Sequence, residues 1–202
     1  KYNTVVKLLI ATKNPGKMRE IREVLGSLPL ELVCLDDLKI ADDVEETGET
    51  HQENAMLKAQ YVYKKTGLMT IGEDSGIYVD AFPGELGVQT RRWKGMHNAT
   101  DEQWIAHFLE QLADVPPEKR TARFVSCAAI VHAKGKETFV GETRGRITQK
   151  PEAPLVPGVP ISSCFIPDGG SKVYSAMTPE EKNKVSHRGK AMAQVRAFLA
   201  RF

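Results

Sequence analysis

This sequence has few cysteines, no long apolar stretch and almost no net charge. The three cysteines, Cys34, Cys127 and Cys164, lie far apart in apolar segments, which predicts free thiols in a reducing compartment. No apolar run approaches the length of a membrane span, and the first residues show no signal-peptide pattern, so we expect a cytoplasmic protein without a membrane partner. A net charge of +2 gives no indication of a nucleic-acid partner. Any anionic ligand must therefore be held by a local group of lysines and arginines.

Internal repeats and low-complexity segments are also absent. With 202 residues, 41% hydrophobic and 27% charged, the chain can form one substantial core, and we expect a single domain over residues 1–202. Strand patterns are predicted at 7–11, 30–35, 68–71, 123–132, 139–142, 145–147 and 164–166. Helices are predicted after the capping residues at 14, 50, 100 and 178, and a terminal helix after residues 186–190.

The first strand leads into the segment Thr12, Lys13, Asn14, Pro15, Gly16 and Lys17. Asn14 and Pro15 are typical of a helix N-cap and first turn, so the spacing predicts a strand, a tight turn and a helix that ends at Gly26. A helix N-terminus favours an anion, Gly16 allows close approach to the backbone, and Lys17 adds a positive charge. Phosphate is the expected ligand, although an ordinary strand–helix unit with a surface lysine explains this segment equally well.

Two acidic segments follow. Residues 42–50 form an acidic stretch that contains Glu46 and leads into a capping box between Thr50 and Glu53. Residues 72–76, Gly-Glu-Asp-Ser-Gly, are interpreted as an exposed tip beyond a strand that ends at Ile71. If Glu46 and Asp74 converge near Lys17, they would form a Mg²⁺ and phosphate pocket, because Mg²⁺ binds carboxylates together with substrate phosphates. Each segment taken alone is more typical of a solvated loop or a turn.

Two basic segments are further candidates for anion binding. The pair Arg91 and Arg92 could clamp a phosphate, and Ser186–Lys190 places His187 and Arg188 at the start of a helix. Taken alone, each is also compatible with a cationic surface. In contrast, the stripe Trp104, Ile105, Phe108, Leu109 and Leu112 is interpreted as core, and His132 as structural.

These segments, in this order, resemble the inosine triphosphate pyrophosphatase family over nearly the whole chain. The resemblance rests on residues 11–17, on 45–48 with Glu53–Ala55 and Lys58, on 73–76, and on 181–183 with 186–190. It implies an elongated α/β fold, in which helices flank a central mixed sheet and a cleft separates two lobes. It also implies a cytoplasmic homodimer that hydrolyses ITP, XTP or dITP to the monophosphate and pyrophosphate.

The resemblance assigns roles to individual positions. It implies that Glu46 and Asp74 hold Mg²⁺ and that Asp74 is also the catalytic base. The substrate-binding residues that it implies are Thr12, Lys13, Asn14, Pro15, Gly16, Lys17, Ser75, Arg92, Lys182, His187 and Arg188. These roles agree with the chemistry of phosphoryl transfer, which depends on positioning and on charge neutralisation.

Three departures from the family pattern stand out. Glu73 replaces an aspartate, the surroundings of Arg92 differ, and the loop expected to read Gly-Phe-Gly-Tyr-Asp-Pro is Gly158–Ser163 here, without aromatic residues or aspartate. Stacking of an aromatic ring on a base contributes about 1–3 kcal/mol, so we expect altered base selection. Three alternatives remain open: the family activity with weakened or shifted preference, the same chemistry on a pyrimidine or modified nucleotide, and a nucleotide-binding protein without turnover.

Overall fold

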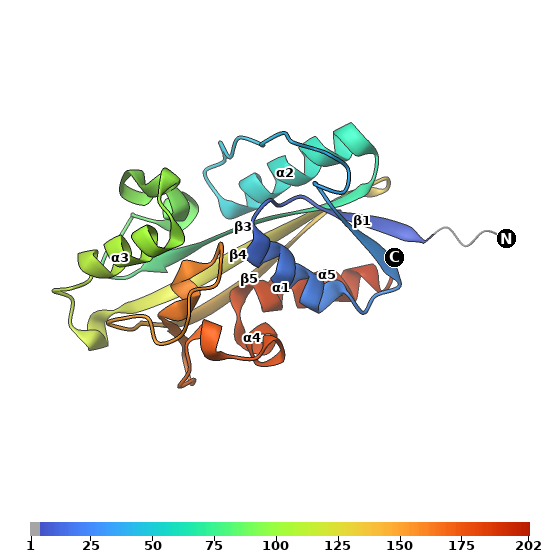
Figure 1. Cartoon of the computed structure of the whole chain (residues 1–202). Helices are drawn as coiled ribbons and strands as arrows, with labels where there is room; N and C mark the ends of the chain where they lie inside the picture. Colours follow the sequence, from blue (N-terminus) through green and yellow to red (C-terminus); the bar gives the residue numbers. More distant parts are fainter. Residues whose placement is uncertain (1–4) are drawn as a thin grey trace.

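One mixed sheet organises the protein, which is described over residues 5–202 by a computed structural model (Figure 1). The strands lie in the order β2-β1-β3-β4-β5-β6, with the bounds β1 Val6–Ile10, β2 Leu30–Cys34, β3 Met69–Val79, β4 Thr121–His132, β5 Gly135–Ile147 and β6 Phe165–Pro167. β1 is parallel to β2 and to β3, whereas the pairs from β3 to β6 are antiparallel. The elongated, mixed sheet of the expected α/β fold is confirmed.

Helices cover both faces of this sheet. The α-helices are α1 Pro15–Leu25, α2 His51–Thr66, α3 Asp101–Gln111, α4 Pro179–Val185 and α5 His187–Leu199, and the short 3₁₀ segments are η1 Gly87–Asn98, η2 Pro117–Lys119, η3 Pro160–Ser163 and η4 Tyr174–Ala176. α2 packs against β3 and β4 on one face, and α5 packs against β4 and β5 on the other, where it also contacts α1 and α4 (Figure 1). η1 and α3 lie at the far end of the long strands, where they form a second lobe (Figure 1).

The helix starts follow the capping residues that the sequence indicates. The Asn14 side chain accepts from the N–H of Lys17, and Pro15 is the first helical residue of α1. Capping boxes are formed at α2 by Thr50 and Glu53, at α3 by Thr100 and Gln103, and at α4 by Thr178 and Glu181. Local sequence therefore fixes where the chain turns into each helix.

The structure corrects the interpretation of residues 72–76 as an exposed tip. Residues 72–76 do not leave the sheet at Ile71 but continue as the middle of β3, which runs unbroken from Met69 to Val79. The sequence misleads here because the two glycines and two acidic residues are typical of a turn. The physical reason for the continuous strand is β4, which pairs with β3 from Thr70 to Val79. Two other predicted pieces, 139–142 and 145–147, likewise belong to one strand, β5.

The other edge of β3 is only partly paired. β1 contacts β3 over Met69, Thr70 and Ile71 and ends at Ile10, after which the chain turns away into α1. Residues 72–79 therefore have a β-strand neighbour on one side only. In an open α/β sheet such a position, beyond the carboxyl end of a strand, is where ligands bind.

Two glycines of β3 let neighbouring elements lie directly on the strand. A Cβ at Gly72 would lie 2.2 Å from the carbonyl oxygen of Ala55 in α2, and a Cβ at Gly76 would lie 2.1 Å from the carbonyl oxygen of Gly87 in η1. No real Cβ approaches an oxygen so closely. The glycines of the acidic segment thus serve the packing of α2 and η1, and they bring the side chains of α2 next to Asp74.

Apolar clusters lie on both sides of the long strands. The predicted stripe of α3 is confirmed as core: Trp104, Ile105, Phe108 and Leu112 are buried with Phe124 and Phe165 in the distal lobe. His132 is buried at the end of β4, where its ring lies near Phe198 and Phe202. All three cysteines are free, with Cys127 and Cys164 buried and Cys34 half-buried.

We predict that Gly72→Ala destabilises the fold by about 1–3 kcal/mol, because the added methyl must push α2 away from β3. Urea unfolding measures the effect. Gly170→Ala is the matched control, since a Cβ there lies no closer than 3.1 Å to any neighbour and φ is not in the left-handed region. Equal stability of the Gly72→Ala protein and the wild type would contradict the direct packing of α2 on β3.

Candidate active site

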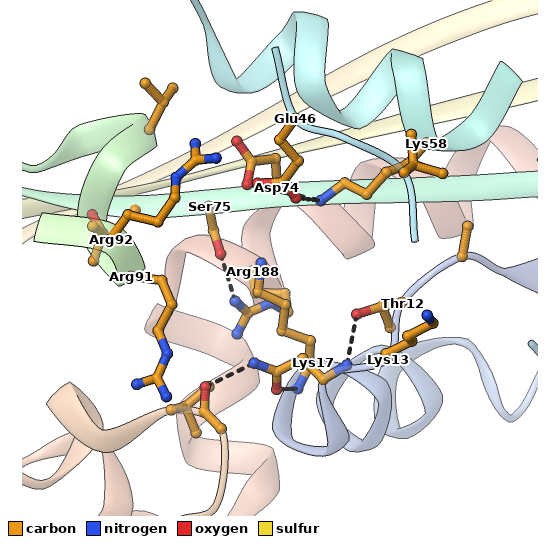
Figure 2. Close-up of a pocket in the computed structure, with 18 of the residues that line it drawn as sticks. Thr12, Lys13, Lys17, Glu46, Lys58, Asp74, Ser75, Arg91, Arg92 and Arg188 are labelled. Atoms are coloured by element: carbon orange, nitrogen blue, oxygen red, sulfur yellow. Dashed lines mark hydrogen bonds and ion pairs between the residues drawn. The ribbon is translucent and has the colours of Figure 1, made fainter. Parts of the chain in front are cut away.

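A cavity of about 620 Å³ lies beside the open edge of β3 (Figure 2). Its walls come from the turn before α1, the acidic segment before α2, the middle of β3, η1, the start of α3 and the loop at η3. The size is typical of a pocket for a small-molecule ligand. The cleft between two lobes that the resemblance implies is therefore present.

Two carboxylates meet at one end of the cavity. Lys58 of α2 lies between them, with its Nζ 2.5 Å from an oxygen of Glu46 and 3.9 Å from Oδ1 of Asp74 (Figure 2). The side chains of Glu46 and Asp74 converge, as the sequence hypothesis requires, although Lys58 and not Lys17 joins them. Lys58 belongs to one motif of the resemblance, but the sequence does not predict it as a site residue.

Asp74 is almost completely buried on the α2 side of β3. Its Oδ2 accepts from Nδ1 of His51 at 2.8 Å, and the amide nitrogen of Asn54 lies 3.4 Å from the same oxygen. Burial by itself raises the pKa of Asp74, but the hydrogen bond from His51 and the charges of Lys17 and Lys58 outweigh it and lower the pKa below its ordinary value. Asp74 is therefore ionised at neutral pH.

Glu73 points to the opposite face of the strand, into a buried group of charges. Its carboxylate lies 2.9 Å from Nζ of Lys17 and 3.2 Å from Nε of Arg188, and it accepts from Oγ of Ser126 at 2.8 Å. Arg188 also donates to Ser75 Oγ at 2.9 Å and forms an ion pair with Glu20 of α1. The longer side chain at 73, a departure from the family pattern, is thus held by Lys17, Arg188 and Ser126.

Glu20 joins two cations from the C-terminal helices. It is 3% exposed and forms ion pairs with Arg188 and with Lys182. Burial alone raises its pKa, but the two cations lower the pKa of Glu20 from 4.5 to about 2. The pKa of Glu73 is likewise held well below its ordinary value, since Arg188 and Lys17 overcome the effect of burial. Both carboxylates remain charged, which fixes Lys17 and Arg188 at the cavity wall.

The segment between β1 and α1 reaches the cavity in part. Thr12, Lys13, Asn14 and Lys17 line it, whereas Pro15 and Gly16 do not. The space above Gly16 is filled by the carbonyl oxygen of Pro157, which would lie 2.7 Å from a Cβ there. A loop of the same chain therefore covers the Cβ side of Gly16, and the binding of substrate by Pro15 and Gly16 stays a prediction.

The two predicted basic segments differ in exposure. Arg91 and Arg92 are exposed and lie across the pocket from Thr12 and Lys13 (Figure 2). His187 and Arg188, in contrast, are buried, so the alternative of a cationic surface turn is wrong. Lys182 is buried behind the wall, 3.4 Å from Ser162 Oγ, and is not among the residues that line the cavity.

His187 forms part of an aromatic stack at the other end of the cavity. The His187 ring lies parallel to that of Phe124, with centroids 4.4 Å apart. The Tyr174 ring also stacks on His187, with a centroid distance of 6.0 Å. Burial, together with the charge of Arg188, holds the pKa of His187 well below its ordinary value, so the ring is neutral at pH 7. This end of the cavity is apolar, with Trp104 and Phe124 in its wall.

The divergent loop closes the apolar end. Residues 158–162 line the cavity, so the departure from the family pattern lies directly at the ligand site. Gly158 fixes the loop between two helix starts: its N–H donates to Asp101 at 2.7 Å, and its carbonyl accepts from the Asn14 amide at 2.9 Å. The loop is therefore tied to both lobes despite its altered sequence.

Several site residues were missed from the sequence. Glu20, His51 and Trp104 carry no signal of their own, since helix patterns explain each of them. His51 in particular lies between the capping residues Thr50 and Glu53, and this pattern gives it no functional role. A spacing argument could have found Asn54 and Lys58, which lie four residues apart on the face of α2 that meets Asp74.

The charged end holds the two carboxylates, Glu46 and Asp74, that the resemblance assigns to Mg²⁺. No group of three or more His, Cys, Asp or Glu side chains that could bind a metal exists within residues 5–202. Glu46 and Asp74 nevertheless face each other across the ammonium of Lys58, which shows that their carboxylates favour a cation at this point. Mg²⁺ is often bound by one or two carboxylates together with substrate phosphates, so this pair fits that ion.

Within residues 5–202, no helix combines the length and the apolarity that crossing a membrane requires.

Fold and cavity together define an α/β protein whose cleft suits an anionic organic ligand, with charges at one end and aromatic rings at the other. The Ham1 family model matches residues 8–198, and the chain belongs to this family. The dITP/XTP pyrophosphatase of Nocardia farcinica is 41% identical over 201 residues, which cover 98% of this chain and 96% of the relative. The dITP/XTP pyrophosphatase of Symbiobacterium thermophilum is 42% identical, over 93% of this chain and 92% of the relative. The chain is accordingly an enzyme, a pyrophosphatase of the same family.

Solved structures agree with this assignment. A HAM1 protein from Coxiella burnetii superposes with a TM-score of 0.81 at 29% identity, covering 98% of this chain and 100% of that one. The dITP/XTP pyrophosphatase from Mycobacterium abscessus has a TM-score of 0.68 at 40% identity, covering 94% of this chain and 98% of that one.

We predict that acid destabilises the protein through Glu20. A carboxyl whose pKa falls from 4.5 to about 2 on folding contributes stability that is fully present above pH 4.5 and is lost as the pH falls toward 2. Glu20→Gln should remove this part of the pH dependence and should cost about 3–5 kcal/mol at neutral pH, because Arg188 and Lys182 lose their shared partner.

Urea unfolding between neutral and acid pH measures both effects. Glu180→Gln is the control, since Glu180 forms an ion pair with Lys184 on the surface, where its side chain is 81% exposed. An unchanged acid profile in Glu20→Gln would show that Glu20 does not hold the two cations.

Proposed function

We propose that this protein hydrolyses a nucleoside triphosphate with a non-standard purine base, ITP, XTP or dITP, to the monophosphate and pyrophosphate. In this proposal it is a Mg²⁺-dependent enzyme that removes such nucleotides from the cytoplasmic pool, and it works as a homodimer. The observation that carries the proposal is the meeting of Glu46, Asp74 and Lys58 in a cavity that is lined elsewhere by cations and aromatic rings. The names of the relatives support the choice of substrate.

The charged end would bind the triphosphate. Lys13 and Lys17 lie on one side of the cavity, and Arg91 and Arg92 lie on the opposite side, so cations on both sides can neutralise phosphate oxygens (Figure 2). Lys17 is held by Glu73, so its ammonium is already in position when the substrate enters. Thr12 and Ser75 supply hydroxyl groups at the same wall. Preorganised cations are effective because phosphoryl transfer depends on positioning and charge more than on covalent catalysis.

Asp74 would be the base. Water attacks the α-phosphorus, a bond from the water oxygen to phosphorus forms, and the bond from the α-phosphorus to its bridging oxygen breaks, so pyrophosphate leaves with the bond's electron pair. Asp74, ionised at neutral pH, accepts the proton of that water. Glu46 and Asp74 would hold Mg²⁺, which, when bound, would offset the negative charge of the phosphates.

The apolar end would hold the base. Trp104, Phe124 and Val159 line it, and His187 is fixed there as a neutral ring by its stack on Phe124. Neutral His187 can donate one hydrogen bond and accept another, which suits the edge of a purine. Arg188 is held by Glu20 and Glu73 and donates to Ser75. It would therefore orient the Ser75 hydroxyl as well as contact the substrate.

The altered loop supports a second candidate. Val159 and Ile161 stand where the family pattern has aromatic residues, and neither can stack on a base as an aromatic ring does. The same chemistry on a pyrimidine or a modified nucleotide is therefore the alternative. The third alternative, a nucleotide-binding protein without turnover, is not supported, because the chain belongs to a family whose relatives are pyrophosphatases.

We predict that the purified protein releases pyrophosphate from ITP, XTP and dITP in preference to the standard nucleotides, and that removing Mg²⁺ abolishes release. A coupled pyrophosphate assay over these substrates and several modified nucleotides, at fixed Mg²⁺, measures this. Preference for another nucleotide would show that residues 159–163 redefine the base site. No release from any of them would contradict the proposed function.

We also predict that Asp74→Asn lowers kcat by about 10²–10⁴-fold, because the amide cannot accept the proton of the attacking water. Steady-state kinetics with the preferred nucleotide measures it. Asp114→Asn, at an exposed position outside the cavity, is the control and should be unchanged. Hydrolysis at the wild-type rate in Asp74→Asn would exclude Asp74 as the base.

A further inference from the structure

The two oxygens of Asp74 have different surroundings. Oδ2 accepts from His51 at 2.8 Å and lies 3.4 Å from the Asn54 amide, on the α2 side. Oδ1 lies 3.9 Å from Nζ of Lys58, which also contacts Glu46. Oδ2 is therefore occupied by hydrogen bonds within the protein, and Oδ1 is the oxygen that can contact a cation or a water in the cavity.

His51 is an unusual first residue for a helix. This position is normally open to solvent, yet His51 is 5% exposed, because Gly72 allows α2 to lie directly on β3. Its ring stands edge-on to Tyr78, with centroids 5.8 Å apart at 89°, which limits its rotation. Capping of α2 does not need His51, since Thr50 and Glu53 already form the capping box.

The direction of the His51 hydrogen bond is fixed by chemistry. An ionised carboxylate can only accept, so the proton must be on Nδ1 of His51. The other ring nitrogen, Nε2, is buried and has no hydrogen-bond partner among residues 5–202. A buried polar atom without a partner costs stability. Structural stability alone therefore does not explain a histidine here, whereas a specific donor for Asp74 does.

We infer that His51 is a positioning residue for the proposed hydrolysis: it holds Oδ2 of Asp74 so that Oδ1 faces the cavity. This inference rests on the proposed function. His51 does not line the cavity. It acts only through Asp74, in the way that hydrogen bonds behind a metal-binding or catalytic side chain commonly fix its orientation.

Three variants test the inference. His51→Phe keeps an aromatic ring but removes the donor. His51→Asn can place an amide donor near the position of Nδ1, and His51→Gln places it further out, near Nε2. Circular dichroism and thermal unfolding establish that each variant is folded before kinetics are compared.

We expect His51→Phe to lower kcat by about 10–100-fold, as is typical when a residue behind a ligand is lost, and to change KM for the nucleotide less than twofold. His51→Asn should recover most of the loss and His51→Gln should not. Wild-type kcat in folded His51→Phe would overturn the inference, and so would equal activity of the Asn and Gln variants. If His51→Phe does not fold, the comparison of kcat between His51→Asn and His51→Gln tests the inference instead.

A second readout does not depend on activity. Long-range ¹⁵N–¹H spectra of the histidine-labelled wild type should show His51 protonated at Nδ1. In Asp74→Ala, the ring proton of His51 should shift toward Nε2. His51→Asn provides the assignment by loss of the signal. A wild-type His51 protonated only at Nε2 would overturn the inference. If the wild type hydrolyses no nucleotide, the proposed function fails by itself, while this measurement still decides whether His51 orients Asp74.

Discussion

The unequal pairing of β3 is the constraint on which the site depends. β4 pairs with β3 from Thr70 to Val79, whereas β1 pairs with it over only three residues and ends at Ile10. The strand is therefore rigid along its whole length, yet one edge is open where the chain turns into α1. Functional side chains on a paired strand are held more precisely than on a loop. Strand alternation then sends Asp74 toward α2 and Glu73 toward α5, so one segment serves both faces.

Buried charges set the positions of the cations around this edge. Glu20 and Glu73 hold Arg188, and Glu73 also holds Lys17, so helices from both ends of the chain are joined at the wall of the cavity. Such a cluster is costly to bury and is weak evidence for stability. Its value lies in placing positive charges before a ligand arrives, which lowers the reorganisation needed on binding. The substitution of glutamate for aspartate at 73 gives the carboxylate the reach to contact both cations and Ser126.

The two ends of the cavity have diverged to different degrees from the family pattern. The charged end departs from the family pattern only at Glu73 and around Arg92, and α2 brings Lys58, Asn54 and His51 to Asp74. The apolar end has lost the aromatic residues of the loop, but the loop remains fixed by Asp101 and Asn14, and Trp104 of α3 lies in the same wall. Chemistry and base selection thus depend on separate elements. A change in the loop can alter the base that is preferred without moving the carboxylates.

The sequence by itself determined the helix starts, the aromatic core of α3 and the order of motifs that places the chain in its family, because capping, periodicity and motif spacing are local properties. The pairing of Glu46 with Asp74 was implied only by the resemblance to the family. Only the tertiary structure decided that residues 72–76 are the middle of a strand, that Gly16 is covered by the 157–159 loop and that Lys182 lies behind the wall. Those facts depend on β4, on η3 and on Glu20, which are distant in sequence. The hydrogen bond between His51 and Asp74 is of the same kind, since packing of α2 on Gly72 creates it and no local pattern encodes that contact.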